Sequence, residues 1–333
     1  MESSLVSVII PAYNAGGYLA ATLDSLLSQT WSPIEIIVVN DGSSDNTLDI
    51  AESYKDKGVI TVSQQNKGQD AALNNGYGYS KGAYIKFMDS DDLLNSEMIE
   101  VQMNALNGSQ EYVAYGEWAR FYGDQPLLAD FTHLDYWKDA APLDFLTSRP
   151  ESVMLQCGIM LVPRKLIDAA GLWDERLILY NDTEFFNRVL LASKGVRFSK
   201  GARLYYRSGM NGSISAGRTR KFFESTLLAT NLIAGQLLAA EDSYRVRNLI
   251  GNSYLDQYYR LYPQLPDLIK ALGRQIARYP EATLKPDGGK VFKTLSRIFG
   301  WKAAKRIQIL FYQLGYRPKD INTTQKTLSA NIA

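Results

Sequence analysis

Residues 83–92 read AYIKFMDSDD, an apolar run that ends in three aspartates within four positions. Its aromatic and β-branched side chains are typical of a buried strand. Carboxylates directly after a strand are suited to hold Mg²⁺ or Mn²⁺, because these hard cations prefer oxygen ligands. In a second interpretation, Asp89 and Asp91 cap a helix that begins near Leu93. This stretch alone leaves both interpretations open.

Two earlier strands extend the pattern toward the N-terminus. Residues 6–11, VSVIIP, precede a turn and then apolar residues at helical spacing up to residue 29. Residues 34–39, IEIIVV, precede a polar turn and a second helical pattern at 48–54. Strands that alternate with helices predict an α/β fold with a mostly parallel sheet and right-handed crossovers.

Polar residues follow the ends of these three strands. Tyr13 comes after the first strand, Asp41 after the second, and the aspartates of residues 89–92 after the third. Because ligands bind parallel sheets at the carboxyl ends of the strands, we expect these residues to share one site.

Five segments, in order along the chain, carry a resemblance to a known family. They are VIIPAYN at 8–14, EIIVVNDGSSD at 35–45, NKG at 66–68, GAYIKFMDSDD at 82–92, and GLWDER at 171–176 with NDTEF at 181–185. They resemble the family 2 glycosyltransferases, whose nucleotide-binding domain has the GT-A fold. The resemblance covers residues 5–215 and implies a GT-A sheet flanked by helices.

The resemblance also implies nucleotide contacts. Tyr13 resembles the aromatic that stacks on the base, next to Pro11, and Asp41 resembles the acceptor of the base imide N–H. Asp89 resembles the first aspartate of the Asp-x-Asp motif, near the ribose and metal, with Ser90 beside it. Taken singly, Tyr13 also fits a loop aromatic and Asp41 a turn residue.

Two further aspartates have implied chemical roles. Asp91 resembles the ligand of the Mn²⁺ or Mg²⁺ ion that holds the sugar diphosphate. Asp182 resembles the general base for the acceptor hydroxyl, although a helix-start carboxylate is the plainer interpretation. The chain departs from the family at Leu73, where an arginine is common, and at Asn181, where a glutamate usually precedes the base. Without the negative charge of that glutamate, the pKa of Asp182 should be raised less than in members that carry it.

The implied activity is inverting, non-processive transfer of a hexose from a nucleoside-diphosphate sugar, with UDP favoured. The acceptor would be a hydroxyl of a saccharide or a lipid-linked saccharide. The chain lacks the Gln-x-x-Arg-Trp motif of the processive members. A catalytically inactive sugar-nucleotide-binding or scaffold protein of the same fold is the alternative. A dinucleotide-dependent oxidoreductase is disfavoured, because no Gly-x-Gly-x-x-Gly follows the first strand.

Composition favours a cytoplasmic globular enzyme. The 333 residues are 46% hydrophobic and include one cysteine, which excludes an intramolecular disulfide. We expect no signal peptide, no transmembrane helix and no nucleic-acid partner. Residues 1–130 carry 6 basic and 18 acidic side chains, whereas residues 131–333 carry 30 and 17. Because the acidic residues 1–130 would repel the diphosphate of a sugar donor, we expect a cation to mediate that contact.

The C-terminal third has a different character. We expect a GT-A catalytic domain at 1–220 and a helical region at 221–333, with helices over 222–262 and 265–279. The Gly- and Ser-rich loop before residue 220 is either a lid, with Arg218 and Arg220 as leaving-group contacts, or a plain connector. Residues 290–317 hold seven basic and no acidic residues among large apolar ones. They favour either peripheral contact with the inner face of the membrane or simple packing on the core.

Overall fold

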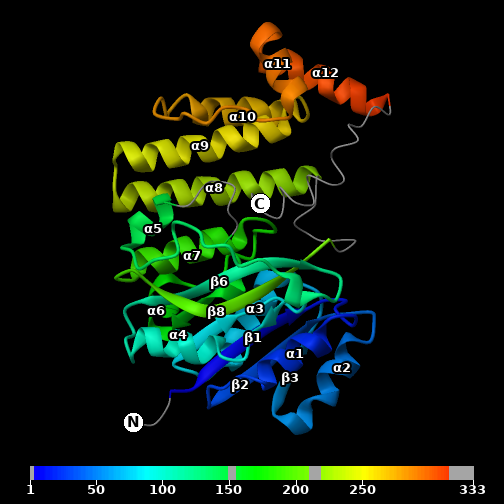
Figure 1. Cartoon of the computed structure of the whole chain (residues 1–333), viewed down its shortest axis with the longest axis vertical. Coiled ribbons are helices and arrows are strands. Elements are labelled where there is room, and N and C mark those ends of the chain that lie inside the picture. The colour runs from blue at the N-terminus through cyan, green and yellow to red at the C-terminus, as the bar shows by residue number, and fades with distance from the viewer. Residues whose placement is uncertain (1–3, 149–154, 210–218, 315–333) are drawn as a thin grey trace. The chain divides into compact units, whose positions relative to one another are not determined.

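The computed structural model describes residues 4–148, 155–209 and 219–314. These residues form two compact units, one of residues 4–148 with 155–209 and one of residues 219–314. The first unit holds a sheet with helices around it, and the described part of the second contains helices (Figure 1).

The strands of the first unit are β1 (Val6–Ala12), β2 (Ile34–Asp41), β3 (Val59–Gln64), β4 (Tyr84–Phe87), β5 (Leu93–Leu94), β6 (Val113–Tyr122), β7 (Met160–Pro163) and β8 (Val196–Ser208). Its α-helices are α1 (Leu19–Leu27), α2 (Thr47–Ser53), α3 (Gln69–Tyr79), α4 (Met98–Leu106), α5 (Pro142–Ser148), α6 (Arg164–Ala170) and α7 (Asn181–Ala192).

The sheet has the strand order β3-β2-β1-β4-β7-β6-β8-β5. Strands β3, β2, β1 and β4 are parallel, as predicted. Beyond β4 the sheet is mixed, because β7 pairs antiparallel with both β4 and β6. Every residue of β1 is buried, which explains why all of its residues except Ser7 are apolar. Because β1 pairs in parallel with both β2 and β4, the carboxyl ends of these three strands lie at one edge of the sheet.

The interpretation of Asp89 and Asp91 as caps of a helix near Leu93 is wrong. Residues 93–94 form β5, which pairs antiparallel with β8, and α4 begins only at Met98. Pairing with a distant strand overrides the local pattern here. The two aspartates lie in the loop between two strands, so helix capping does not account for them.

Helix α3 packs unusually close to the sheet. A Cβ atom at Gly76 would lie 2.5 Å from Ile9 Cγ2 and 3.0 Å from Val39 Cγ2, so only glycine fits without displacement. This close approach holds α3 against β1 and β2, and Gln69 and Asp70 are the first two residues of this helix.

Helix α7 is held on the sheet by an aromatic layer. The Phe185 ring stacks on Trp173 with centroids 4.1 Å apart, and both rings meet Phe87 of β4 edge-on at 5.5 and 5.2 Å. Such ring pairs add to the free energy gained by burial. The layer anchors the first turn of α7 next to the end of β4.

The described part of the second unit contains α8 (Arg220–Ala240), α9 (Tyr244–Leu261), α10 (Pro266–Ile276), α11 (Lys290–Phe299) and α12 (Trp301–Gln313) (Figure 1). The helix predicted over residues 222–262 is thus two helices, with a break at residues 241–243. Helix α9 contacts both α8 and α10. Within the described ranges, no helix is long and apolar enough to cross a bilayer.

Candidate functional site

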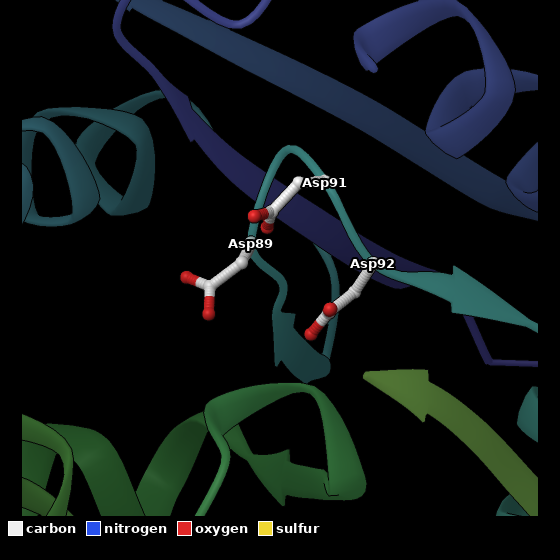
Figure 2. Close-up of side chains that lie close together, drawn as sticks. All are labelled: Asp89, Asp91 and Asp92. Atoms are coloured by element: carbon white, nitrogen blue, oxygen red, sulfur yellow. The ribbon is translucent and has the colours of Figure 1, made fainter. Parts of the chain in front are cut away.

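Three carboxylate side chains project from one short loop after β4. Asp89, Asp91 and Asp92 each offer an oxygen, and these atoms lie within 4.8 Å of one another. Figure 2 shows the three side chains together on this loop. The sequence predicted this three-carboxylate cluster as a cation site and gave individual roles to Asp89 and Asp91, and the structure brings the carboxylates of all three together.

The loop is held by contacts from two other elements. Thr22 of α1 donates its hydroxyl to the carbonyl oxygens of Ser90 and Asp92, each at 2.9 Å. Arg207 of β8 donates its backbone N–H to Asp92 Oδ1 at 2.9 Å and its Nε to the Asp91 carbonyl at 3.0 Å. These bonds mainly use backbone oxygens, so they fix the loop and leave most of its carboxylate oxygens for a ligand.

The electrostatics of the cluster fit a divalent cation. Burial raises the pKa of Asp89 to about 6, helped by the charge of Asp182, and that of Asp91 to about 7, helped by Asp89. Burial also raises the pKa of Asp92 well above its usual range, and its Oδ2 is buried with no partner among the described residues. A bound cation would relieve this repulsion and satisfy that oxygen.

The residues predicted to hold the nucleotide lie on neighbouring strand ends. Pro11 is buried in β1, whereas Tyr13, just beyond it, is 54% exposed and free to offer a ring face. Asp41 is buried at the end of β2. Its Oδ1 accepts hydrogen bonds from Gln64 Nε2 at 2.8 Å and Lys67 N at 2.9 Å, and its Oδ2 accepts one from Gly68 N at 2.9 Å.

Asp41 therefore shapes the loop before α3. A carboxylate has about four lone-pair positions, so one acceptor position remains for a donor such as a base N–H. Its role in base recognition stays a prediction.

Asp182 lies in the first turn of α7, where its Oδ1 accepts the Thr183 N–H at 2.9 Å. It is therefore a helix-start carboxylate, as the plainer interpretation holds. It lies at the start of a helix that is tied to the surroundings of the cluster, because Asn181 donates to Asp70 and the adjacent Gln69 donates to Asp89. The charge of Asp182 also helps to raise the pKa of Asp89. The fold thus brings together two segments that are about 90 residues apart in the sequence.

Three further residues contact the site without having been predicted. Gln69 Nε2 donates to Asp89 Oδ1 at 2.9 Å, and the Cys157 thiol donates to the same oxygen at 3.7 Å. Asp70 accepts a hydrogen bond from Asn181. The resemblance gave no role to these side chains. Leu73, where the family often has arginine, is fully buried, so it offers nothing to a nucleotide.

The predicted lid residues are only partly described. Arg218 lies outside the described residues. Arg220 is the first residue of α8, where it forms ion pairs with Glu224 at 2.7 Å and with Asp267. A contact of Arg220 with a leaving group stays a prediction.

Solved structures share this fold. A crystal structure of S. aureus TarS 1–349 in complex with UDP-GlcNAc aligns with a TM-score of 0.69 and 20% identity, over 94% of this chain and 93% of that chain. The corresponding complex with UDP has a TM-score of 0.67. The chain thus has the GT-A glycosyltransferase fold, as predicted.

Residues 7–170 match the model of glycosyl transferase family 2, which assigns this segment of the chain to that family. An uncharacterized glycosyltransferase of Rickettsia typhi is 37% identical over 193 residues, which are 57% of this chain and 60% of the relative. Glycosyltransferase GlyG of Streptococcus pneumoniae is 38% identical over 122 residues, which are 36% of this chain and 40% of GlyG. The chain therefore spans 60% or less of the length of these relatives.

Proposed function

We propose that this protein transfers a hexose from a UDP-sugar to a hydroxyl of a saccharide or lipid-linked saccharide, with inversion and one sugar at a time. The observation that carries the proposal is the Asp89–Asp92 carboxylate cluster at the carboxyl edge of the sheet, linked to the start of the Asp182 helix by the Gln69–Asp89 and Asn181–Asp70 hydrogen bonds. The UDP complexes of TarS, which has the same fold, support the choice of donor. We assign the transfer to residues 1–220.

Each group has a proposed task. Tyr13 stacks on the base, and Asp41 accepts its N–H. Asp89 and Asp91, together with Asp92, would hold Mn²⁺ or Mg²⁺, which would neutralise negative charge on the diphosphate leaving group. Asp182 takes the proton of the acceptor hydroxyl while the hydroxyl oxygen attacks the anomeric carbon and the bond from that carbon to the diphosphate breaks. A single displacement of this kind inverts the configuration.

The first test is nucleotide binding by the purified wild-type protein. We expect UDP with Mn²⁺ to raise the melting temperature, because a ligand at about 100 times its Kd adds about 2.7 kcal/mol to the free energy of unfolding. UDP without metal should raise it much less, and NAD should not change it. Turnover of a UDP-hexose by the same sample then separates an enzyme from the inactive alternative. Stabilisation by NAD alone would contradict the proposal.

We further propose that α11 and α12, here called the basic helix pair, rest on an anionic membrane surface. Trp301 packs on Tyr258, Tyr259 and Tyr262 of α9, so part of the pair belongs to the second unit. Other apolar side chains remain 49–73% exposed: Val291, Ile298, Phe299, Leu310, Phe311 and Leu314. Basic residues accompany them: Lys290, Lys293, Arg297, Lys302, Lys305 and Arg306. Each basic side chain near anionic lipid contributes about 1 kcal/mol.

A vesicle assay tests this contact. The full chain should sediment with vesicles that contain phosphatidylglycerol, and less with pure phosphatidylcholine or in high salt. The variant Phe299→Glu should weaken binding about tenfold or more, because a charge would enter the apolar layer. Leu127→Glu is the matched control, since Leu127 is 92% exposed in the first unit. Equal binding by both variants, or none by wild type, would exclude the contact.

A further inference from the structure

Asp70 is a buried carboxylate whose burial does not favour the stability of the fold. Its side chain is 3% exposed in the first turn of α3, and its Oδ2 is buried with no hydrogen-bond partner among the described residues. Burial raises its pKa to about 7, against the hydrogen bond from Asn181, which lowers it. A carboxylate in the first turn suits the helix dipole, but burial makes its charged form unfavourable.

The contacts of Asp70 lead to the proposed base. Its Oδ1 accepts a hydrogen bond from Asn181 Nδ2 at 2.5 Å, and Asn181 is the first residue of α7, directly before Asp182. The residue on its other side, Gln69, donates to Asp89 Oδ1 at 2.9 Å. Two adjacent residues of α3 thus contact the donor-side carboxylate and the start of the base helix.

We propose that Asp70 is a positioning residue for glycosyl transfer: through Asn181 it holds the first turn of α7, and so directs the Asp182 carboxylate at the acceptor hydroxyl. This inference rests on the function proposed above. A small misplacement of a reacting group lowers a rate strongly, because the productive geometry is narrow.

A merely structural tie between α3 and α7 is the competing explanation. A second pair of bonds already joins α3 to the segment before α7, because Asn74 Nδ2 donates to the Trp173 carbonyl and Trp173 N–H donates to Asn74 Oδ1, each at 3.0 Å. The aromatic layer around Phe185 adds to this attachment. Loss of the Asp70 bond should therefore leave the fold intact.

The experiment separates the hydrogen bond from the charge. Asp70→Ala removes the acceptor, and should lower kcat about tenfold or more while the donor KM changes less than about twofold. Asp70→Asn keeps an acceptor for Asn181 and should retain most of the activity. Asn181→Ala should match Asp70→Ala, and the double variant should lose little more, because both changes remove the same bond. Tyr77→Phe is the control, since it removes a bond of the same kind from α3 to Asp168 of α6.

Thermal stability gives an independent readout. A raised pKa in the folded state destabilises the fold above the unfolded pKa, so Asp70→Asn should melt at or above the wild-type temperature. The gain should be larger at pH 8 than at pH 5, because the charged form predominates only above about pH 7. A structural role for the charge would lower the melting temperature of Asp70→Asn.

Each result has a definite meaning. Full kcat in Asp70→Ala and Asn181→Ala, a loss expressed only in the donor KM, or losses that multiply in the double variant would overturn the positioning role. The wild type and Asp182→Ala are assayed together with these variants. No transfer by wild type would mean that the proposed function has failed, whereas an active wild type with an inactive Asp182→Ala leaves only the role of Asp70 in question.

Discussion

Asp182→Asn should lower kcat by about 10²–10⁴-fold, which is the usual contribution of a general base. The amide has the shape of the carboxylate but cannot accept the acceptor proton at neutral pH. Stabilisation by UDP and Mn²⁺ should persist, because Asp182 lies on α7 and is not one of the clustered carboxylates on the β4 loop. Steady-state kinetics with a UDP-hexose and an acceptor, together with melting curves, measure the two effects.

The matched control for Asp182 is Asp168→Asn. Asp168 is an exposed aspartate of α6 in the same unit. Its variant should have wild-type kcat. Donor turnover that survives Asp182→Asn unchanged would remove the base from the mechanism, and an equal loss in Asp168→Asn would point to a general effect of lost negative charge.

Asp91→Asn should abolish the metal-dependent part of nucleotide binding and lower kcat by about 10²-fold or more, because charge stabilisation of the leaving group is lost. The unliganded variant should be at least as stable as wild type, since burial and the charge of Asp89 raise the pKa of Asp91 to about 7. The variant thus gains stability and loses function. Melting temperatures with and without UDP and Mn²⁺ measure both changes.

Asp56→Asn provides the comparison for Asp91, because Asp56 is exposed on the 3₁₀ helix Lys55–Lys57. It should keep the full response to UDP and Mn²⁺. If Asp91→Asn also keeps that response, the cation is held elsewhere or is not used. If Asp91→Asn melts far below wild type without ligands, the carboxylate has a structural role that its burial does not reveal.

The sequence contained most of the fold and the residue types of the site. The apolar runs at 6–11, 34–39 and 83–88 predicted the central strands, because strands covered on both faces are mostly apolar. The polar residues after them could be placed at one edge by topology alone. The error at Leu93 arose because pairing with β8 depends on residues more than 100 positions away.

Other parts of the site could not be predicted from one sequence. Arg207 fastens a loop that lies 115 positions earlier in the chain, and no local pattern marks that contact. Asp70 and Asn181 are 111 positions apart. Each looks ordinary by itself, since Asp70 reads as a helix-start residue and Asn181 as a deviation from the family. Only the folded chain brings them within hydrogen-bond distance of each other.

The aromatic layer has a consequence for how the protein loses activity. The loop that carries the aspartate cluster follows β4, and Asp182 lies in the first turn of α7. The rings of Phe87, Trp173 and Phe185 join β4 to α7 inside the core. The loop and the base helix therefore cannot separate without exposing that core. Inactivation by heat or denaturant should coincide with the cooperative unfolding of the whole first unit, because assembly of the site and condensation of the core are one transition.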